Sequence, residues 1–361
     1  MGRKVRVAIV GCGGIANGKH FPSLKKIDEV EMIAFCDIIR ERAEKAAAEF
    51  GVPGARVYED FKEMIDKEKP EVVHVCTPNR EHAPVSIYAM EHDCHVMCEK
   101  PMAKTYADAK AMLDAHIKTG KKLTIGYQSR FRGDSQFIKR ACENDELGEI
   151  YFAKGHAVRR RAVPTWGVFL DEEEQGGGPL IDIGTHALDL TLWCMDNYKP
   201  KRVTGSVYKK LGDQKETGNA WGDWDPKEYT VEDSAFGFIQ MENGATIILE
   251  SSWALNTLDV KEAKCSLCGT KAGADMNDGA TINLAKYGKL TTIKPELSAG
   301  GAAFFDGKTE DPAEIEARQW IDAVINDTEP CVKPEQALCV TRILEAIYES
   351  AKTGKEIVFD D

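Results

Sequence analysis

A continuous apolar run of strand length, followed at once by a glycine-rich turn, constrains the fold more than any other feature of this sequence. The run is VRVAIV at residues 5–10, and the turn is GCGGIA at residues 11–16, ahead of a segment of helical character. Gly11 permits a tight turn, Gly13 lets the backbone approach a pyrophosphate, and Ala16 allows the helix to pack closely on the strand. A helix N-terminus also presents free N–H groups to an anion. The spacing therefore predicts a dinucleotide-binding turn.

Strands and helices alternate through the first part of the chain. Apolar runs of strand length recur at 30–36, 71–76, 95–98 and 122–125, and segments of helical pattern lie between them at 41–51, 82–91 and 106–119. Strands with two apolar faces, separated by helices, indicate a parallel sheet that is covered on both sides. We therefore predict a doubly wound α/β domain over residues 1–126.

An acidic residue closes the second predicted strand. Asp37 follows VEMIAFC about 20 residues after the glycine-rich turn, where a residue that binds the ribose 2′-hydroxyl is expected. A carboxylate accepts hydrogen bonds from the ribose diol of NAD and repels the 2′-phosphate of NADP. The sequence therefore predicts NAD as the cofactor, with NADP less favoured.

Two further strands of this domain end in polar motifs. The strand at 71–76 runs into TPN at 77–79 and then His82, and the strand at 95–98 runs into EKP at 99–101. Ligands of open parallel sheets bind at the carboxyl ends of the strands, and a proline restricts the residue before it. From the spacing alone, Lys100 is either a surface lysine before a turn or a lysine held at the ligand crevice.

The segment LIDIGTHALDLTLW, at 180–193, is apolar apart from one polar stripe. At about 100° per residue, Asp182, His186, Asp189 and Trp193 share one face of a predicted helix. Such a helix is usually buried, and a buried carboxylate must be compensated. Two explanations stay open from these residues: a buried pair in which each group satisfies the other, or a polar face that lines a cavity where chemistry occurs. Asp189 is expected to be structural, as a partner of His186.

Taken together, these motifs resemble those of the Gfo/Idh/MocA oxidoreductases. The resemblance covers about residues 5–195 and includes GCGGIA, Asp37, TPN with His82, EKP and GGGPLIDIGTHALDL, in the order of the family. It implies an N-terminal Rossmann domain and, over residues 127–361, a C-terminal α/β domain with a mostly antiparallel open sheet. A late helix of such a protein can pack back on the first domain.

The resemblance also implies roles for individual residues. Lys100, Asp182 and His186 would be catalytic and would contact the substrate. Arg160 and Trp166 are predicted to contact it as well, because guanidinium and indole groups suit a hydroxyl-rich ligand. The residues expected to bind NAD are Gly11, Gly13, Gly14, Ile15, Ala16, Asp37, Thr77, Pro78, Asn79, His82, Glu99, Lys100 and Gln128.

Elementary chemistry agrees with the catalytic assignment. Oxidation of a secondary alcohol needs a base near the hydroxyl while hydride leaves the carbon. His186 has a suitable intrinsic pKa, Asp182 could orient its ring, and Lys100 could donate to the developing alkoxide. We therefore predict an NAD-dependent dehydrogenase that acts on a secondary hydroxyl of a sugar, glycoside or cyclic polyol.

Within the family, GCGGIANGKH and RRRAVPTWG resemble members that oxidise glucosides, including C-glycosides, at carbon 3. Inositol dehydrogenase is the nearest alternative, because the same three residues would serve it. A redox-neutral glycosidase, which oxidises carbon 3 transiently and then eliminates, is a second alternative. A nucleotide sensor without activity is a third, and the presence of Lys100, Asp182 and His186 speaks against it.

The second half of the chain is expected to shape the substrate pocket. Strands are predicted at 149–158, 201–208, 234–241, 245–255 and 263–269, an Asn-Gly hairpin turn lies in MENGAT, and helices are predicted at 312–326 and 334–352. The resemblance implies a homo-oligomer, a dimer or tetramer, formed through the open sheet. The sequence leaves open the tasks of the loop at 211–230 and of the arginine run at 159–161.

Charge and cysteine content limit the partners. The formal net charge is -12, which argues against nucleic acid or an anionic membrane as a partner.

No apolar run approaches a membrane span, and MGRKVRVAIVGCGG lacks a signal-peptide pattern, so a cytoplasmic protein is expected. Eleven cysteines without regular spacing indicate reduced thiols. We expect no metal site at His92, Cys94, His95 and Cys98, or at Cys265 and Cys268.

Overall fold

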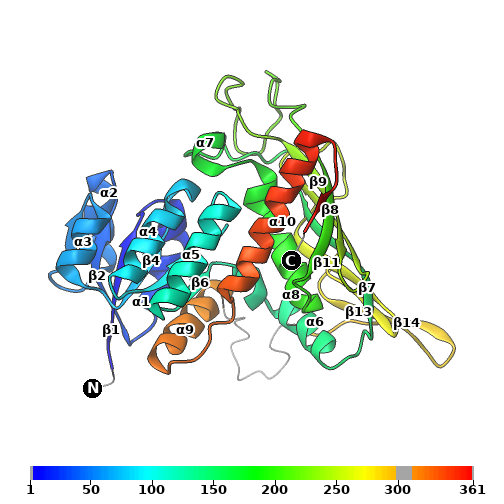
Figure 1. Cartoon of the computed structure of the whole chain (residues 1–361), viewed down its shortest axis with the longest axis horizontal. Coiled ribbons are helices and arrows are strands. Elements are labelled where there is room, and N and C mark those ends of the chain that lie inside the picture. The colour runs from blue at the N-terminus through cyan, green and yellow to red at the C-terminus, as the bar shows by residue number, and fades with distance from the viewer. Residues whose placement is uncertain (1–2, 298–310, 360–361) are drawn as a thin grey trace. The chain divides into compact units, whose positions relative to one another are not determined.

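The computed structural model describes residues 3–297 and 311–359, which divide into two compact units (Figure 1). Unit 1 comprises Met1–Gln128 and Glu310–Leu338, and unit 2 comprises Ser129–Thr309 and Cys339–Asp361. Each unit has its own sheet and its own core.

Unit 1 is built on a six-stranded parallel sheet in the order β3-β2-β1-β4-β5-β6. The strands are β1 (Val5–Val10), β2 (Val30–Cys36), β3 (Arg56–Tyr58), β4 (Val72–Val75), β5 (His95–Cys98) and β6 (Leu123–Ile125). The central strands are buried on both faces, as their unbroken apolar sequences require. The strand order reverses between β1 and β4, which places the ligand crevice of such a sheet at the carboxyl ends of these strands.

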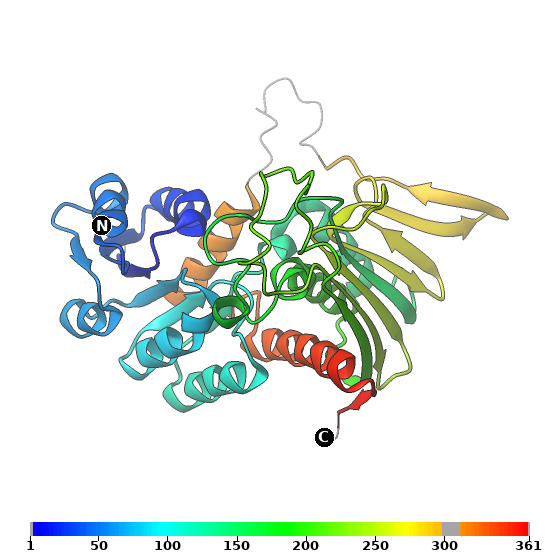
Figure 2. The ribbon, with the colours of Figure 1, turned by 90° about the horizontal axis from the view of Figure 1, so that it is seen from above.

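Helices cover both faces of this sheet. They are η1 (Ala16–His20, a π-helical turn), α1 (Phe21–Lys25), α2 (Arg40–Phe50), α3 (Phe61–Glu68), α4 (Asn79–Glu91), α5 (Tyr106–Thr119) and α9 (Pro312–Ile325). Figure 2 shows α1, α2 and α9 on one side of the strands and α4 and α5 on the other. The doubly wound fold predicted for this part of the chain is confirmed.

Helix α9 belongs to unit 1 although it lies near the end of the chain. Its apolar face, with Trp320, Ile321 and Val324, is buried in the same core as Phe21 and Leu24 of α1. Because this burial removes large apolar side chains from water, it fixes α9 to unit 1. Residues 310–338, which the predicted boundary assigns to the second domain, therefore group with the first unit.

Unit 2 is built on a nine-stranded sheet in the order β14-β13-β12-β11-β7-β10-β9-β8-β15. The strands are β7 (Ile150–Val158), β8 (Pro200–Tyr208), β9 (Ser234–Met241), β10 (Thr246–Ser252), β11 (Lys261–Gly269), β12 (Ala272–Asp275), β13 (Thr281–Lys286), β14 (Lys289–Ile293) and β15 (Ile357–Val358). Adjacent strands are antiparallel except β7 and β10, which are parallel. This confirms the expected mostly antiparallel second sheet.

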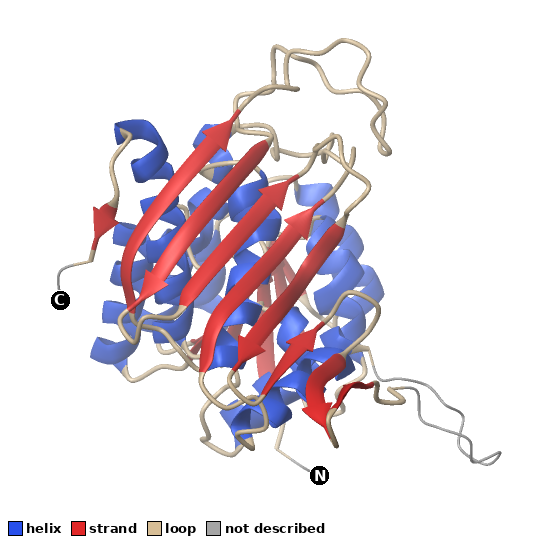
Figure 3. Cartoon of the chain, turned by 90° about the vertical axis from the view of Figure 1, so that its right-hand side faces the viewer, coloured by secondary structure: helices blue, strands red, loops and turns tan. Residues whose placement is uncertain are grey.

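The helices of unit 2 pack on one face of its sheet. They are α6 (Gly133–Glu143), α7 (Glu172–Gln175), η3 (Leu180–Gly184, a π-helical turn), α8 (Thr185–Met195) and the larger part of α10 (Pro334–Thr353). A Cβ at Gly205 or Gly237 would lie within 2.7 Å of Ile347, so α10 approaches the backbone of β8 and β9 directly. In Figure 3 the other face of this sheet lies toward the viewer, and no helix of the described residues crosses it.

Local chemistry accounts for several element boundaries. Asp60 and Thr105 accept hydrogen bonds from the first turns of α3 and α5, and Gly120 ends α5 with a φ of 68°. The predicted Asn-Gly hairpin joins β9 and β10. The helix predicted over 180–193 differs in its first part, because η3 forms a π-helical turn before α8 begins.

Candidate active site

The glycine-rich turn lies between the carboxyl end of β1 and the N-terminus of η1. Gly11 has a φ of 91°, and a Cβ there would lie 2.5 Å from the carbonyl oxygen of Cys76 at the end of β4. Glycine is therefore required at residue 11 by its backbone conformation and by its close neighbour. A Cβ at Gly13 or Gly14 would meet no described atom within 4 Å, so the outer part of the turn is open to a ligand. Ala16 is fully buried.

Asp37 is held in place at the carboxyl end of β2. One carboxylate oxygen accepts the Cys12 N–H at 2.8 Å and the other accepts the Ile39 N–H at 2.8 Å. The side chain is buried. Each oxygen keeps a second acceptor site, so Asp37 can bind a ribose diol without losing these bonds.

Thr77, Pro78, Asn79 and His82 lie after β4, at the start of α4. The Thr77 hydroxyl is buried and has no hydrogen-bond partner among the described residues. Both ring nitrogens of His82 contact carbonyl oxygens, Pro101 at 2.8 Å and Thr77 at 3.0 Å. His82 therefore lies between the TPN loop and the EKP loop. Burial lowers the pKa of its ring, so the neutral ring has one N–H and donates to one of these two oxygens.

Glu99 of the EKP motif is the centre of a buried ionic cluster. Its Oε1 lies 2.7 Å from Lys19 Nζ and 2.8 Å from His20 Nε2, and Lys19 Nζ also lies 2.7 Å from Glu316 Oε2 of α9. Burial would raise the pKa of Glu99, but Lys19 and His20 hold it well below its usual value. Burial would lower the pKa of Lys19, but the two glutamates raise it. Lys19 and Glu99 are therefore both charged near neutral pH.

The two buried histidines of this cluster are neutral. Burial lowers the pKa of His20 and lowers that of His74 further. The contact between His20 and Glu99 is therefore a hydrogen bond from a neutral ring and not an ion pair. Since His20 Nε2 donates to Glu99, its Nδ1 must accept, and His74 Nδ1 donates to it across 2.9 Å.

Lys100 follows this cluster directly. Its backbone N–H donates to Glu99 Oε2 at 3.2 Å, and its peptide bond to Pro101 is cis. Gln128, after β6, accepts from Lys19 at 3.2 Å. The ionic cluster therefore holds the backbone at Lys100 and the side chain of Gln128, the last residue of the first segment of unit 1.

The carboxyl edge of this sheet fits a dinucleotide. The open glycine turn can take the pyrophosphate, Asp37 can accept from the ribose, and the buried Thr77 hydroxyl can bond to a further polar group of the cofactor. When bound, NAD would supply the nicotinamide that exchanges hydride with a substrate.

In unit 2, the loop before η3 is anchored by a buried carboxylate. Glu232 accepts the Gly178 N–H at 2.7 Å, the Leu180 N–H at 3.1 Å and the Tyr348 hydroxyl at 2.8 Å. A Cβ at Gly178 would lie 2.3 Å from the carbonyl oxygen of Glu232, so glycine permits this approach. Burial raises the pKa of Glu232. Glu232 satisfies the free N–H groups at the start of the helical segment.

Asp182 and His186 lie near the start of this segment, four residues apart. Asp182 Oδ2 accepts a hydrogen bond from the indole N–H of Trp253 at 2.9 Å. Trp253 is fully buried after β10, so this bond fixes the carboxylate on a rigid neighbour. His186 lies in the first turn of α8 and is buried. The two predicted catalytic residues of unit 2 are therefore brought to the same face of one helical segment.

Asp189, on the same stripe, has a different partner from the one predicted. It forms a bidentate pair with Arg130, at 2.9 Å from Nε and 2.6 Å from Nη2, and both side chains are 0% exposed. Burial raises the pKa of Asp189, and Arg130 opposes this shift. Asp189 thus anchors α8 to the segment before α6.

The three arginines of the run at 159–161 differ in their surroundings. Arg159 pairs with Glu262 and lies 5.1 Å above the ring of Trp221. Burial would lower the pKa of Arg159, but Glu262 and, to a smaller extent, Asp182 raise it. Arg160, the predicted substrate residue, is exposed. Arg161 bonds to Gln214 and Asn256. Arg159 therefore has an electrostatic link to Asp182.

Two sequence profiles match most of the chain. The one described as an oxidoreductase family with an NAD-binding Rossmann fold matches residues 5–127, and the one described as a GFO/IDH/MocA C-terminal domain matches residues 135–275. The chain belongs to the Gfo/Idh/MocA oxidoreductase family. This confirms the predicted oxidoreductase and its NAD-binding domain.

Relatives in this family include sugar and polyol enzymes. The chain is 37% identical over 354 residues to D-glucoside 3-dehydrogenase of Escherichia coli (strain K12), which covers 98% of this chain and 97% of that protein. It is 25% identical over 290 residues to inositol 2-dehydrogenase of Salmonella typhimurium, covering 80% of this chain and 78% of that protein.

Solved structures share the fold over the whole chain. Levoglucosan dehydrogenase in complex with NADH and L-sorbose matches with a TM-score of 0.83 and 20% identity, covering 100% of both chains. Aldose-aldose oxidoreductase from Caulobacter crescentus matches with a TM-score of 0.80 and 24% identity, covering 99% of this chain and 100% of that chain. At these identities the structures establish the fold of this Gfo/Idh/MocA protein and nothing finer.

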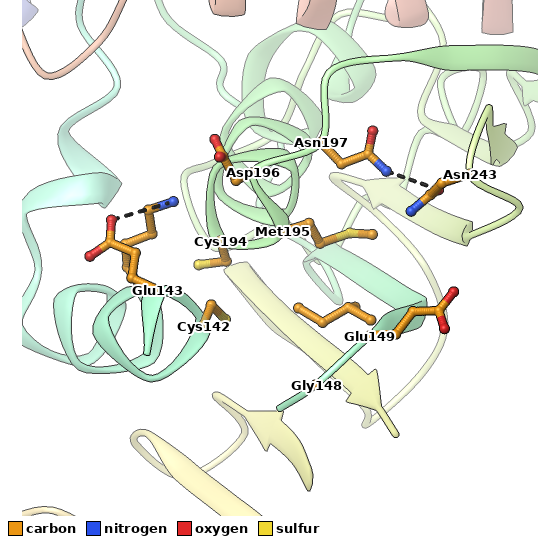
Figure 4. Close-up of a pocket in the computed structure, with 11 residues that line it drawn as sticks. Cys142, Glu143, Gly148, Glu149, Cys194, Met195, Asp196, Asn197 and Asn243 are labelled. Carbon is orange, nitrogen blue, oxygen red and sulfur yellow. Dashed lines mark hydrogen bonds and ion pairs between the residues drawn. The ribbon is translucent and has the colours of Figure 1, made fainter. Parts of the chain in front are cut away.

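A pocket of about 540 Å³ lies at the other end of α8 from His186 (Figure 4). Its lining includes Cys142, Glu149, Asp196, Asn197 and Asn243, and the Asn197 amide donates to Asn243 Oδ1 at 3.1 Å. None of the predicted site residues lines it. Since eight residues of helix separate His186 from Cys194, the nearest lining residue of α8, roughly 12 Å of axial rise lies between them.

The described residues, 3–297 and 311–359, contain both potential metal ligands and thiols. No group of three or more His, Cys, Asp or Glu side chains in these ranges could hold a metal ion. All eleven cysteines are free thiols. Helices within the described ranges were also compared with a membrane span. None of them is both long enough and apolar enough to cross a bilayer.

Sequence reasoning missed most of the supporting residues. Lys19, Glu316, Glu232, Trp253 and Arg130 each contact or anchor a predicted site segment, yet none was singled out. Their partners lie far away along the chain, so spacing gives no signal for them. One weak signal existed for Glu232, because the start of a buried helical segment needs an acceptor for its N–H groups.

Proposed function

We propose that this protein is an NAD-dependent dehydrogenase that oxidises the carbon-3 hydroxyl of a glucoside. The observation that carries the proposal is the 37% identity, over 98% of the chain, to a D-glucoside 3-dehydrogenase. The candidate residues of both units support it, since each class of group that alcohol oxidation needs is present.

Each residue of the proposed reaction has a separate task. His186 takes the proton of the substrate hydroxyl as the hydride leaves carbon 3. Asp182, fixed by Trp253, stabilises the imidazolium that forms. The ammonium group of Lys100 donates to the oxygen on which negative charge develops. Unit 1 supplies Lys100 with the NAD site, and unit 2 supplies Asp182 and His186.

A substrate panel tests this proposal against its rivals. Purified protein would be incubated with NAD and with methyl glucoside, free glucose or myo-inositol, while NADH absorbance is followed and products are identified by mass spectrometry. We expect NADH to accumulate with an intact glycoside two mass units lighter. Turnover of inositol alone would favour a polyol dehydrogenase. Cleavage of the glycoside without net NADH would favour the redox-neutral glycosidase.

Replacement of Asp37 by serine is expected to relax the preference for NAD over NADP by about 10-fold or more. Serine still accepts a hydrogen bond from a ribose but no longer repels a 2′-phosphate. The ratio of kcat/KM for the two cofactors measures the change. Glu49→Ser, which removes an exposed carboxylate from the far end of α2, should leave the ratio unchanged. A constant ratio in Asp37→Ser would mean that the ribose is bound elsewhere.

We further propose that the protein forms a homo-oligomer through the open face of the second sheet. Alternate residues of neighbouring strands place Phe152, Ile248, Phe236 and Tyr208 on this face beside Phe238, which is 51% exposed. Large apolar side chains on a sheet face, beside polar groups such as Glu250 and His156, suit an interface between subunits.

Phe238→Glu tests this interface. A charge at the centre of a symmetric apolar contact occurs twice in each dimer, so self-association should weaken by on the order of 10²-fold. Analytical ultracentrifugation measures the change. Ile117→Glu, at an exposed position of α5 in unit 1, serves as the control. A wild-type protein that sediments as a monomer at all concentrations would refute the proposal.

We also propose that the protein acts in the cytoplasm. Its eleven free cysteines suit a reducing compartment, where glutathione keeps thiols reduced.

A further inference from the structure

A row of aromatic rings leads outward from Asp182. Trp253, which donates to Asp182, has its ring centre 6.4 Å from that of Phe169. Phe169 lies 5.9 Å from Trp166, and Trp166 lies 5.1 Å from Trp221. We name Trp166, Phe169 and Trp221 the aromatic platform. It begins at a proposed catalytic residue and ends on the surface.

The outer members of the platform are exposed. Trp166 is 52% exposed and Trp221 is 44% exposed, whereas Trp253 is fully buried. Their indole planes meet at 70°, so the two rings form the walls of an open corner. A flat ring placed in this corner can stack on one indole and meet the edge of the other, which are the two favoured aromatic geometries.

The platform is held rigidly by two loops of unit 2. The Thr165 hydroxyl donates to the Trp221 carbonyl oxygen at 2.8 Å, and Asn219 accepts the Val163 N–H at 2.8 Å and donates to the Val163 carbonyl oxygen at 3.0 Å. These loops, after β7 and after β8, lie together beyond one end of the sheet (Figures 1 and 2). Bonds between them fix the exposed indoles before any ligand arrives, which lowers the entropy cost of binding.

Arg159 adds a polar rim to the corner. Its guanidinium lies 5.1 Å from the Trp221 ring, is held by Glu262, and interacts electrostatically with Asp182. A planar guanidinium beside an indole offers donors to hydroxyl and ether oxygens next to a surface for stacking. The combination suits a ring that carries oxygen atoms.

We infer that the aromatic platform binds the aglycone ring of the glucoside. The inference rests on the proposed function, because a sugar whose carbon 3 lies at Asp182 must project its aglycone away from the reacting centre. The row of rings starts beside Asp182, and its exposed outer members, Trp166 and Trp221, supply a surface for that second ring. The platform therefore selects glucosides with a ring-shaped aglycone over simple alkyl glucosides.

Two substrates that differ in the aglycone alone test the inference. For phenyl glucoside, Trp221→Ala and Trp166→Ala should each raise KM by about 10-fold with little change in kcat. For methyl glucoside, KM should stay within about twofold, because no second ring reaches the platform. Trp221→Phe, which keeps a ring, should recover most of the loss. Tyr287→Ala, at an exposed turn between β13 and β14, is the matched control.

A binding measurement separates this inference from the proposed function. Titration of the NAD complex with phenyl glucoside should quench tryptophan fluorescence more strongly than methyl glucoside does, and Trp221→Ala should remove the difference. Binding of phenyl glucoside without turnover would refute the proposed reaction and leave the platform in place. Equal effects of the variants on both glucosides, or a changed oligomeric state in Trp221→Ala, would overturn the inference.

Discussion

Alanine in place of Lys100 is expected to lower turnover by on the order of 10²-fold or more while NAD still binds. The variant removes the proposed donor to the developing alkoxide. It keeps the backbone N–H that donates to Glu99, so the loop at the end of β5 retains its main anchor. The rate of NADH formation at saturating substrate measures the first effect, and a fluorescence titration with NADH measures the second.

The matched control for this prediction is Lys110→Ala. Lys110 is an exposed lysine of α5 that pairs with Asp114 one turn away, so the variant removes the same charge far from the EKP motif. It should leave turnover unchanged. If Lys100→Ala turned over at the wild-type rate, Lys100 would have no part in the reaction. If it lost NAD affinity and turnover to the same degree, Lys100 would serve cofactor binding alone.

Most of the first unit was predictable because its signals are local, although β3 and α3 were not predicted. Apolar runs of four to seven residues with two buried faces identify the parallel strands, and Gly11 has the left-handed backbone that the phosphate turn requires. Asp37 was found by its distance from that turn. Such features depend on neighbours in the sequence, so spacing is sufficient to detect them.

The second half was less predictable, since its partners are distant in sequence. The short strands β12, β13 and β14 escaped prediction because weak alternation over a few residues does not differ from that of a loop. The π-helical turn η3 also escaped. The N–H groups of Leu180, its first residue, and of Gly178, just before it, are bonded by Glu232, which lies far along the chain. For Asp189, the same distance led to the wrong partner, because Arg130 lies on another element.

The candidate site shows the same contrast between residues with local sequence signals and residues whose partners are distant in sequence. Sequence spacing found Lys100, Asp182 and His186 as residues, and their catalytic roles remain predictions. It did not find the groups that hold them, because a buried charge is compensated in three dimensions and not along the chain. Glu99 is predicted to contact NAD. Its carboxylate also binds Lys19 and His20, and so supports the loop that carries Lys100.

Methionine in place of Lys19 is expected to lower the free energy of unfolding by about 3–5 kcal/mol, because it leaves Glu99 and Glu316 buried without their shared cation. Urea unfolding of the full chain, followed by far-UV circular dichroism, measures the loss. Lys67→Met, which breaks an exposed pair with Glu63, should cost no more than about 0.5 kcal/mol.

The pH dependence of this loss identifies its cause. In the wild type the pKa of Glu99 is held well below its usual value, so its stabilising contribution is present above the pKa of the unfolded chain and is lost as the pH falls through the folded value. Without Lys19, burial should raise the pKa of Glu99 and Glu316. At mildly acidic pH both groups are then protonated, which removes the cost of burying two unpaired charges in the variant. The stability difference between Lys19→Met and wild type should therefore be largest near pH 8 and should shrink toward pH 5. An equal difference at both pH values would mean that Lys19 stabilises unit 1 by packing rather than by charge.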